Sequence, residues 1–116
     1  MTNKDTLKTQ PLRLVVKKKD GSTFEAYALD VSNDGMRLVA DQHLPKGEIV
    51  DLDVYLSLSD PFPIRVVGES LWSRELGDEP VLINLDLNRS HTNNLNALLR
   101  QVEIQKSLSE DKLHTL

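Results

Sequence analysis

Apolar and polar residues alternate along most of the chain between residues 12 and 87. A period of two places successive side chains on opposite faces, which is the pattern of a β-strand with one buried face. The pattern is clearest at 50–59, where Val50, Leu52 and Val54 share one face and Asp or Tyr residues lie between them. Such runs predict six strands, at 12–17, 23–29, 36–40, 50–59, 64–73 and 81–87.

Turn signals separate these runs. Asp20-Gly21 is a strong hairpin signal between the first two strands. Segments 45–47, 60–63 and 75–80 contain proline and break the chain between later strands. Inside the fifth run, Gly68 predicts a bulge or a close approach of another backbone.

The period becomes helical after residue 87. Apolar residues then recur at the spacing of one helix face, at Leu95, Leu98, Leu99 and Val102. We predict a helix at about 90–108, capped by Ser90 or Thr92, and a frayed tail at 109–116. Residues 1–11 are predicted to be a flexible basic segment. Residues 12–108 then form a mainly β domain, a small six-stranded antiparallel barrel with a C-terminal helix packed across it.

The composition is that of one soluble globular domain of 116 residues. There is no Cys, which excludes disulfides, thiolate zinc sites and cysteine nucleophiles and is compatible with a reducing compartment. No apolar run approaches the roughly 18 residues that a membrane-spanning helix needs. We therefore expect a cytoplasmic protein that does not insert into membranes.

Charge is distributed unevenly. The net charge is -4 at pH 7, but residues 1–19 carry six positive residues against Asp5 alone. The rest of the chain carries 8 positive and 17 negative residues, or -9. This acidic surface argues against binding to a nucleic-acid polymer. An anion site near the N-terminus is compatible with the basic segment.

The segment Asp30-Val31-Ser32-Asn33-Asp34-Gly35 lies between the second and third predicted strands. Asp, Ser and Asn side chains can bond the backbone two residues on, and Gly adopts positive φ without a Cβ penalty. The segment therefore predicts a defined tight turn. Its polar groups are also suited to hold a ligand.

This turn, the strand order and the terminal helix together resemble the PilZ domain family, bacterial receptors and adaptors of cyclic di-GMP signalling. The resemblance covers nearly the whole chain and implies a split barrel of six strands with a C-terminal helix. Asp30, Ser32 and Gly35 match the family's [DN]xSxxG motif at every specified position. It implies that Asp30 accepts hydrogen bonds from guanine, Ser32 bonds the ligand or braces the turn, and Gly35 allows close backbone approach.

The family's second motif, RxxxR, is degenerate in this chain. Its expected place before the first strand holds Lys4 and Lys8, with the spacing kept. A rival placement is Arg13 and Lys17, which has the same spacing but lies inside the first predicted strand. Lysine keeps the charge but loses the bidentate fork that fits phosphate and guanine. At about 1 to 3 kcal/mol per bidentate contact, two replacements weaken binding by roughly 30-fold to 10⁴-fold.

The last predicted strand, 81–87, also departs from the family. Members usually have a Gly, a branched residue and a Phe there, whereas this chain has no glycine and offers Leu85 to fill the barrel. This casts doubt on access of the ligand more than on the fold.

Other candidate chemistry is weak. His43, His91 and His114 lack metal-ligand spacing, so we predict no metal site. Asp51 and Asp53 alternate on a solvated strand face without a nucleophile or a phosphate loop. We therefore predict no enzyme and no resident cofactor.

Four aromatic residues lie outside the solvent-facing side of the predicted strand at 50–59. They are few, and their neighbours are apolar. They are Phe24, Tyr27, Phe62 and Trp72. We predict that they pack in the core and do not form a platform for stacked bases.

Two functions follow from the resemblance. In the first, the protein is a single-domain signalling adaptor that binds cyclic di-GMP weakly and passes the signal to a protein partner. The alternative is a ligand-independent interaction module, like members associated with type IV pilus assembly or motility. The partner is unknown in both cases, and the apolar helix face from Leu95 to Val102 is equally suited to pack on a second copy of the chain.

Overall fold

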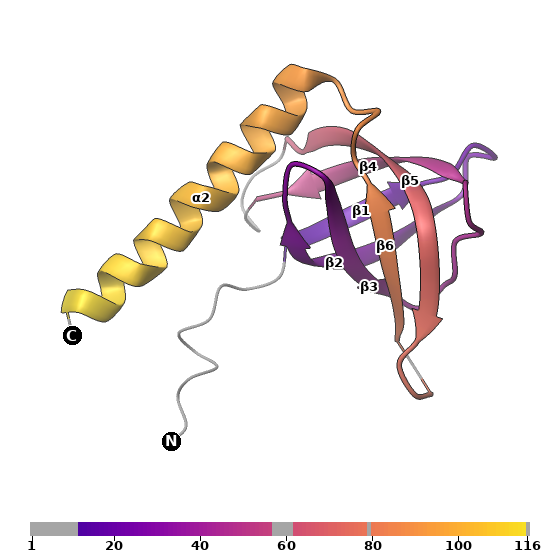
Figure 1. The fold of residues 1–116 in the computed structure, drawn as a ribbon, viewed down its shortest axis with the longest axis horizontal. Coiled ribbons are helices and arrows are strands. Elements are labelled where there is room, and N and C mark those ends of the chain that lie inside the picture. The colour runs from indigo at the N-terminus through magenta and orange to yellow at the C-terminus, as the bar shows by residue number, and fades with distance from the viewer. Residues whose placement is uncertain (1–11, 57–61, 79, 116) are drawn as a thin grey trace.

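The computed structural model describes residues 12–56, 62–78 and 80–115, with side chains described up to residue 104. Strands come first and the helix last (Figure 1). The bounds are β1 Leu12–Lys17, β2 Thr23–Val31, β3 Gly35–Ala40, β4 Ile49–Tyr55, β5 Ile64–Glu75, β6 Val81–Asp86 and α2 Thr92–Thr115.

The six strands form a closed barrel in the order β1-β2-β3-β6-β5-β4. All neighbouring pairs are antiparallel, and β1 closes the barrel against β4. The hairpin predicted at Asp20-Gly21 is present, because the amide of Gly21 donates to the carbonyl of Lys18 at 2.9 Å and Gly21 has φ 91. The predicted fold class, a six-stranded antiparallel barrel with a C-terminal helix, is confirmed.

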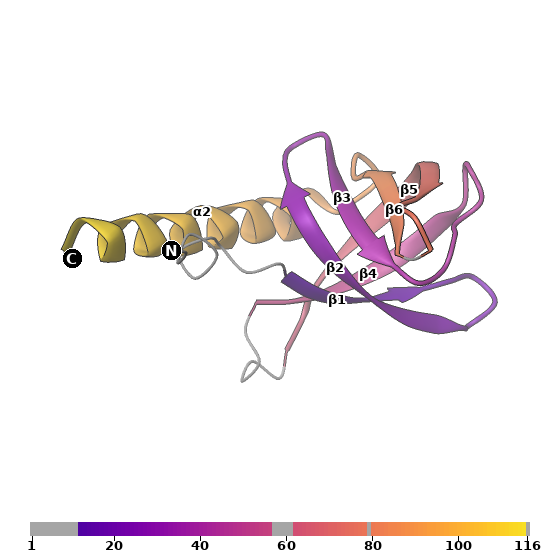
Figure 2. The same cartoon turned by 90° about the horizontal axis from the view of Figure 1, so that it is seen from below.

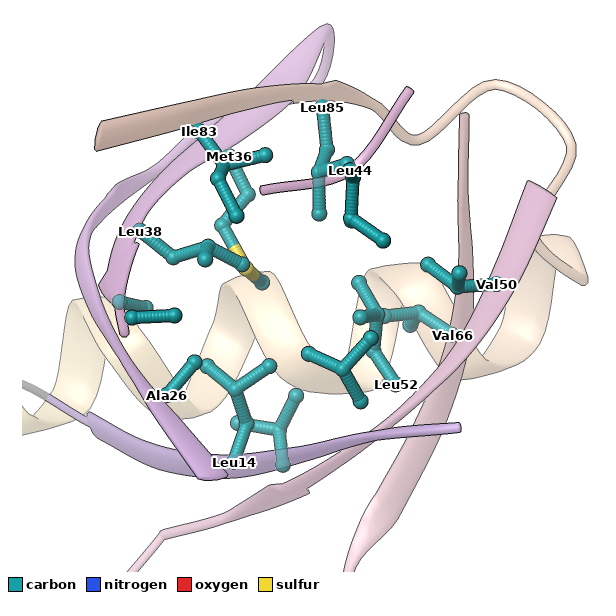
Figure 3. Packing of buried hydrophobic residues seen from close by; sticks show 14 of the residues in the cluster. Leu14, Ala26, Met36, Leu38, Leu44, Val50, Leu52, Val66, Ile83 and Leu85 are labelled. Atoms are coloured by element: carbon teal, nitrogen blue, oxygen red, sulfur yellow. The ribbon is translucent and has the colours of Figure 1, made fainter. Parts of the chain in front are cut away.

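The barrel interior is filled by one side of each strand (Figure 3). Leu14, Leu52, Val54 and Ile83 have no exposed surface, and the alternating partners on β1 and β4 are at least partly exposed. Leu85, predicted to fill the barrel, is also fully buried. The faces predicted from the alternation are therefore confirmed for these strands.

Gly68 on β5 lies against two core side chains. A Cβ there would lie 3.1 Å from a Leu85 methyl group and 3.2 Å from a Leu52 methyl group. The predicted bulge or close approach of a backbone is not found at Gly68, where the close contacts come from side chains. The irregularity of β5 falls between Ser70 and Trp72.

Helix α2 begins after a histidine cap. The amide of Asn93 donates to Nδ1 of His91 at 3.3 Å, and the amide of Leu95 donates to the His91 carbonyl at 3.0 Å. The predicted cap, Ser90 or Thr92, was wrong. The Ser90 hydroxyl is bonded to the backbone of Val67 on β5, at 2.9 Å to both the amide and the carbonyl.

Helix α2 ends at Thr115. The helix therefore runs through most of the segment 109–116 that we predicted to be a frayed tail and past the predicted end at residue 108. No Pro or Gly follows Thr92, so nothing in the sequence interrupts the helical hydrogen bonds. Leu98 is fully buried as part of the core cluster. The rest of the helix projects away from the strands (Figure 2). In the described part of the chain no helix is long and apolar enough to cross a membrane.

The aromatic side chains differ from the prediction. Phe24 is in the core at 7% exposure, but Tyr27, Trp72 and Phe62 are 45%, 40% and 78% exposed. Tyr27 alternates with buried neighbours on β2 and so lies outside. Trp72 follows the irregularity between Ser70 and Trp72 on β5, where the alternation is interrupted. The prediction of core packing was wrong for these three residues, because apolar composition does not itself say which face a residue takes.

Candidate functional site

A tight turn joins β2 to β3 and carries the polar motif. The amide of Ser32 donates to the carbonyl of Gly35 at 2.8 Å, and the amide of Asp34 donates to the Ser32 hydroxyl at 3.3 Å. The Ser32 hydroxyl also lies 3.5 Å from the Gly35 carbonyl. Ser32 thus braces the turn from inside.

Gly35 is explained by close packing between strands. It does not have positive φ, unlike Gly21, Gly47 and Gly77, so that part of the sequence interpretation was wrong. A Cβ on Gly35 would collide with the carbonyl oxygen of Leu85 and lie 3.5 Å from its carbonyl carbon. Glycine is required here because the backbone of the neighbouring strand β6 leaves no room for a Cβ.

Asp30 forms an ion pair with Arg37 across the β2–β3 hairpin. Nε of Arg37 donates to Oδ2 of Asp30 at 2.9 Å, and Nη2 donates to the same oxygen. These hydrogen bonds raise the pKa of Arg37 above its ordinary value. Both side chains are about half exposed, at 52% and 51%, so the pair adds little to stability but orients both groups.

Register across the barrel extends this pair into a row. Asp30 lies opposite Arg37, Arg37 opposite Asn84, and Asn84 opposite Trp72. We call these four residues, on β2, β3, β6 and β5, the ligand row. Sequence reasoning missed Arg37 and Asn84. For Arg37 the alternation alone was a sufficient signal, since it places this residue outward between Met36 and Leu38.

An open cleft of about 260 Å³ runs between the turn and the ligand row. Its walls include Asp30, Ser32, Gly35, Arg37 and Asn84. The bulge residue Leu71 adds an apolar wall, and its side chain is 39% exposed. The cleft therefore offers a carboxylate, a guanidinium, an amide and a hydrophobic surface within one small volume.

A second cleft, of about 410 Å³, separates the turn from α2. Ser32 lines both clefts, and Leu99, Arg100 and Val102 line the second from the helix side. The turn is also tied to the start of the helix connection, because the amide of Leu87 donates to the carbonyl of Asp34 at 3.3 Å.

The structure does not bring Arg13 into the cleft beside the turn. Arg13 donates to Glu25 at 2.8 and 3.2 Å, which raises the Arg13 pKa, and its guanidinium lies 4.9 Å from the Tyr55 ring centre. Lys4 and Lys8 lie outside the described residues. Of the predicted site residues, the structure therefore brings together Asp30, Ser32 and Gly35.

Comparison with protein-family models finds one match, to PilZ (PilZ domain), over residues 9–103. This range covers most of the chain and the whole barrel. The chain belongs to the PilZ domain family. PilZ domains are generally cyclic di-GMP-binding adaptor domains and not catalytic ones. No curated protein matches the sequence.

No group of three or more His, Cys, Asp or Glu side chains among the described residues is arranged to hold a metal ion. The PilZ match begins at residue 9, so the lysines at positions 4 and 8 lie just before it. The family thus accounts for the turn motif and leaves the role of those lysines to experiment.

Proposed function

We propose that this PilZ protein is a cytoplasmic adaptor that binds cyclic di-GMP weakly at the Asp30–Gly35 turn and passes the signal to a protein partner. The observation that carries the proposal is the cleft beside the turn. There Asp30 and Arg37 present a carboxylate and a guanidinium side by side on an open face. The lack of Cys in the sequence is compatible with the cytoplasm.

Each member of the ligand row has a part in this proposal. The Asp30 carboxylate accepts from guanine N–H groups, and the Arg37 guanidinium meets a phosphate or the O6 and N7 acceptors of guanine. Asn84, which lies opposite Arg37, supplies a donor and an acceptor. The exposed Trp72 ring is a surface on which a base can stack.

Two features keep the expected affinity low. Asp30 is already bonded to Arg37, so a ligand donor has to share or displace that contact. The basic segment contributes Lys4 and Lys8, which lack the arginine fork. We therefore expect binding in the micromolar range.

The alternative is a ligand-independent interaction module. One observation favours it: Ser32 braces the turn and Gly35 makes room for β6, so the fold needs both residues without a ligand. Only Asp30 in the motif has a role that the turn alone does not require. The two functions therefore differ in what Asp30 does.

Isothermal titration with cyclic di-GMP tests the proposal. We expect saturable binding that is lost in Asp30→Ala and weakened roughly 5- to 150-fold in Trp72→Ala, the range of one base–aromatic stack. Asp53→Ala is the matched control, because Asp53 pairs with Arg65 on another outer face. No heat at about 100 µM ligand would contradict the receptor and leave the interaction module.

Restoring arginine tests the placement of the degenerate motif. The double variant Lys4→Arg with Lys8→Arg should tighten binding by about 1.4 kcal/mol, a tenfold change, or more. The comparison is Lys17→Arg, at the end of β1, which completes the same spacing with Arg13 at the rival placement. If Lys17→Arg tightens binding and the first pair does not, the motif is not at positions 4 and 8.

A further inference from the structure

Trp72 of the ligand row faces outward because strand β5 contains one extra residue. Before that residue the buried positions of β5 are even-numbered, at Val66, Gly68 and Ser70. Regular alternation would therefore turn Trp72 towards the barrel interior. Leu71 interrupts the alternation, and Trp72 instead lies opposite Asn84 with 40% of its surface exposed.

The pairing of β5 with β6 locates the extra residue. Ser70 lies opposite Leu85, and Ser73 lies opposite Ile83. Both partners are fully buried core residues, and they are two residues apart on β6, whereas the two serines are three residues apart on β5. The register passes over Leu71, which is therefore the bulged residue.

The loop between β3 and β4, residues 41–48, holds both sides of this bulge. The carbonyl oxygen of Leu44 accepts from the Ser70 hydroxyl at 3.3 Å and from the Ser73 hydroxyl at 3.0 Å. The amide of Leu44 donates to the Ser73 hydroxyl at 3.2 Å. We call these three residues the bulge clasp. Residues three apart in a regular strand point to opposite faces, so one carbonyl reaches both hydroxyls here because the strand is bulged.

The loop is held in place by its own buried side chain. Leu44 is 2% exposed and belongs to the core cluster in the barrel interior (Figure 3). Two backbone hydrogen bonds also join the loop to Ser70. The amide of Gly47 donates to the Ser70 carbonyl at 2.7 Å, and the amide of Ser70 donates to the carbonyl of Glu48 at 2.9 Å. The bulge is thereby fixed against the packed core.

A second contact acts on the Trp72 ring from the outer side. The guanidinium of Arg74 lies 5.6 Å from the ring centre, within the range of a cation–π interaction. Such a contact influences the tilt of the ring, but the backbone decides which face of the strand carries it. The bulge clasp acts on the backbone, because Ser70 and Ser73 lie on either side of Trp72.

We propose that Ser73 is a positioning residue for the nucleotide site, acting with Ser70 and Leu44 through the bulge that turns Trp72 outward. The inference rests on the proposed function, in which the Trp72 ring is a surface for a stacked base. Ser73 is not part of the wall of the cleft beside the turn. Its hydroxyl keeps the ring in one orientation before the ligand arrives, so less conformational freedom is lost on binding.

The fluorescence of Trp72 tests the positioning without nucleotide, because it is the only tryptophan in the chain. In Ser73→Ala, which removes the hydroxyl, we expect lower fluorescence anisotropy and stronger quenching by acrylamide than in the unchanged protein. Ser73→Thr keeps the hydroxyl and should restore both values. Unchanged anisotropy and quenching in Ser73→Ala would overturn the inference.

An NMR titration with cyclic di-GMP, which extends to weak binding, measures the consequence for the site. Ser73→Ala should weaken binding roughly 3- to 10-fold, a part of the roughly 5- to 150-fold loss expected for Trp72→Ala. In a protein that already carries Trp72→Ala, Ser73→Ala should have no further effect on affinity, because the ring that Ser73 positions is gone. An equal loss in both backgrounds would mean that Ser73 acts on the fold in general, and would contradict the inference.

Ser90→Ala is the matched control. The Ser90 hydroxyl accepts from the amide of Val67 and donates to its carbonyl, both at 2.9 Å, which is the arrangement that Ser73 makes with Leu44. Val67 is on the same strand, four residues before the bulged Leu71. Ser90→Ala should lower the unfolding temperature about as much as Ser73→Ala and leave Trp72 fluorescence and nucleotide affinity unchanged. Equal changes in the control and in Ser73→Ala would reject the inference.

A second variant and the unchanged protein keep the outcomes distinct. Ser70→Ala removes the other hydroxyl bonded to Leu44, so it should move anisotropy and affinity in the same direction even if Ser73→Ala does not fold. If the unchanged protein binds no nucleotide, the proposed function fails and the role of Ser73 in it falls as well. If the unchanged protein binds and both serine variants bind as tightly, only the inference about Ser73 is overturned.

Discussion

Replacing Gly35 by alanine tests why the family motif ends in glycine. The added Cβ would collide with the carbonyl oxygen of Leu85 in β6. That oxygen belongs to the backbone of β6, which is paired with β3 at Gly35 and Asp86. A backbone oxygen in a paired strand cannot move aside as a side chain can. Overpacking of this kind costs about 2–3 kcal/mol.

The free energy of unfolding from urea denaturation measures this cost, and the unfolding temperature should fall by about 10 °C. Gly68→Ala is the comparison, because its Cβ would meet only the methyl groups of Leu85 and Leu52, at 3.1 and 3.2 Å. Those groups can rotate, so Gly68→Ala should cost about 1 kcal/mol, less than Gly35→Ala.

Substitution by asparagine distinguishes two reasons for a glycine: a lack of room for a Cβ and a backbone with positive φ. At a position with positive φ, asparagine is better tolerated than alanine. Gly77 has φ 83 and open space for a Cβ, so Gly77→Asn should be milder than Gly77→Ala. At Gly35 the order should reverse, because asparagine brings more atoms to the same collision. A milder effect of Gly35→Asn than of Gly35→Ala would refute the steric explanation.

Three other predictions concern the helix cap, an acidic turn and the core. His91→Asp should stabilise the protein by about 1 kcal/mol in urea denaturation, because aspartate caps helices well and the first turn of α2 has no acidic residue. The pKa of Asp20 is lowered from 3.8 by hydrogen bonds from Ser22, so its contribution to stability is present above that pH and is lost as the pH falls through the lower, folded value. An NMR titration of Ser22→Ala should show the Asp20 pKa moving back towards 3.8, and an unchanged pKa would contradict the assigned cause. Leu85→Ala should cost about 2–5 kcal/mol in denaturant, because Leu85 is fully buried, and a cost below about 1 kcal/mol would mean that the barrel interior is not close-packed there.

The local features of the fold were predictable from the sequence. Alternation identified the buried faces of β1 and β4, and Asp20-Gly21 identified the first hairpin. These features depend on residues that are neighbours in the chain. The turn motif was found for the same reason, since Asp30, Ser32 and Gly35 lie within one hairpin.

Features that depend on distant segments were predicted less well. Ser90 appeared suited to cap α2, but its hydroxyl is bonded to Val67 in β5, and His91 caps the helix. Tyr27 and Trp72 were assigned to the core from their apolar character, whereas their strand positions point outward. Another strand decided the outcome for Ser90, which bonds β5, and for Trp72, which follows the irregularity in the pairing of β5 with β6. The outward direction of Tyr27 was readable from the alternation of β2.

The sequence by itself determined that this protein is a PilZ-like barrel with a polar turn between its second and third strands. A period of two is a local property that each strand carries in its own residues. Only the tertiary structure decided what meets between strands that are distant in the chain: Arg37 with Asn84, Gly35 with the backbone of Leu85, and Val39 with Leu82. These pairings depend on the insertion of β6 between β3 and β5, which brings together segments that the chain keeps far apart.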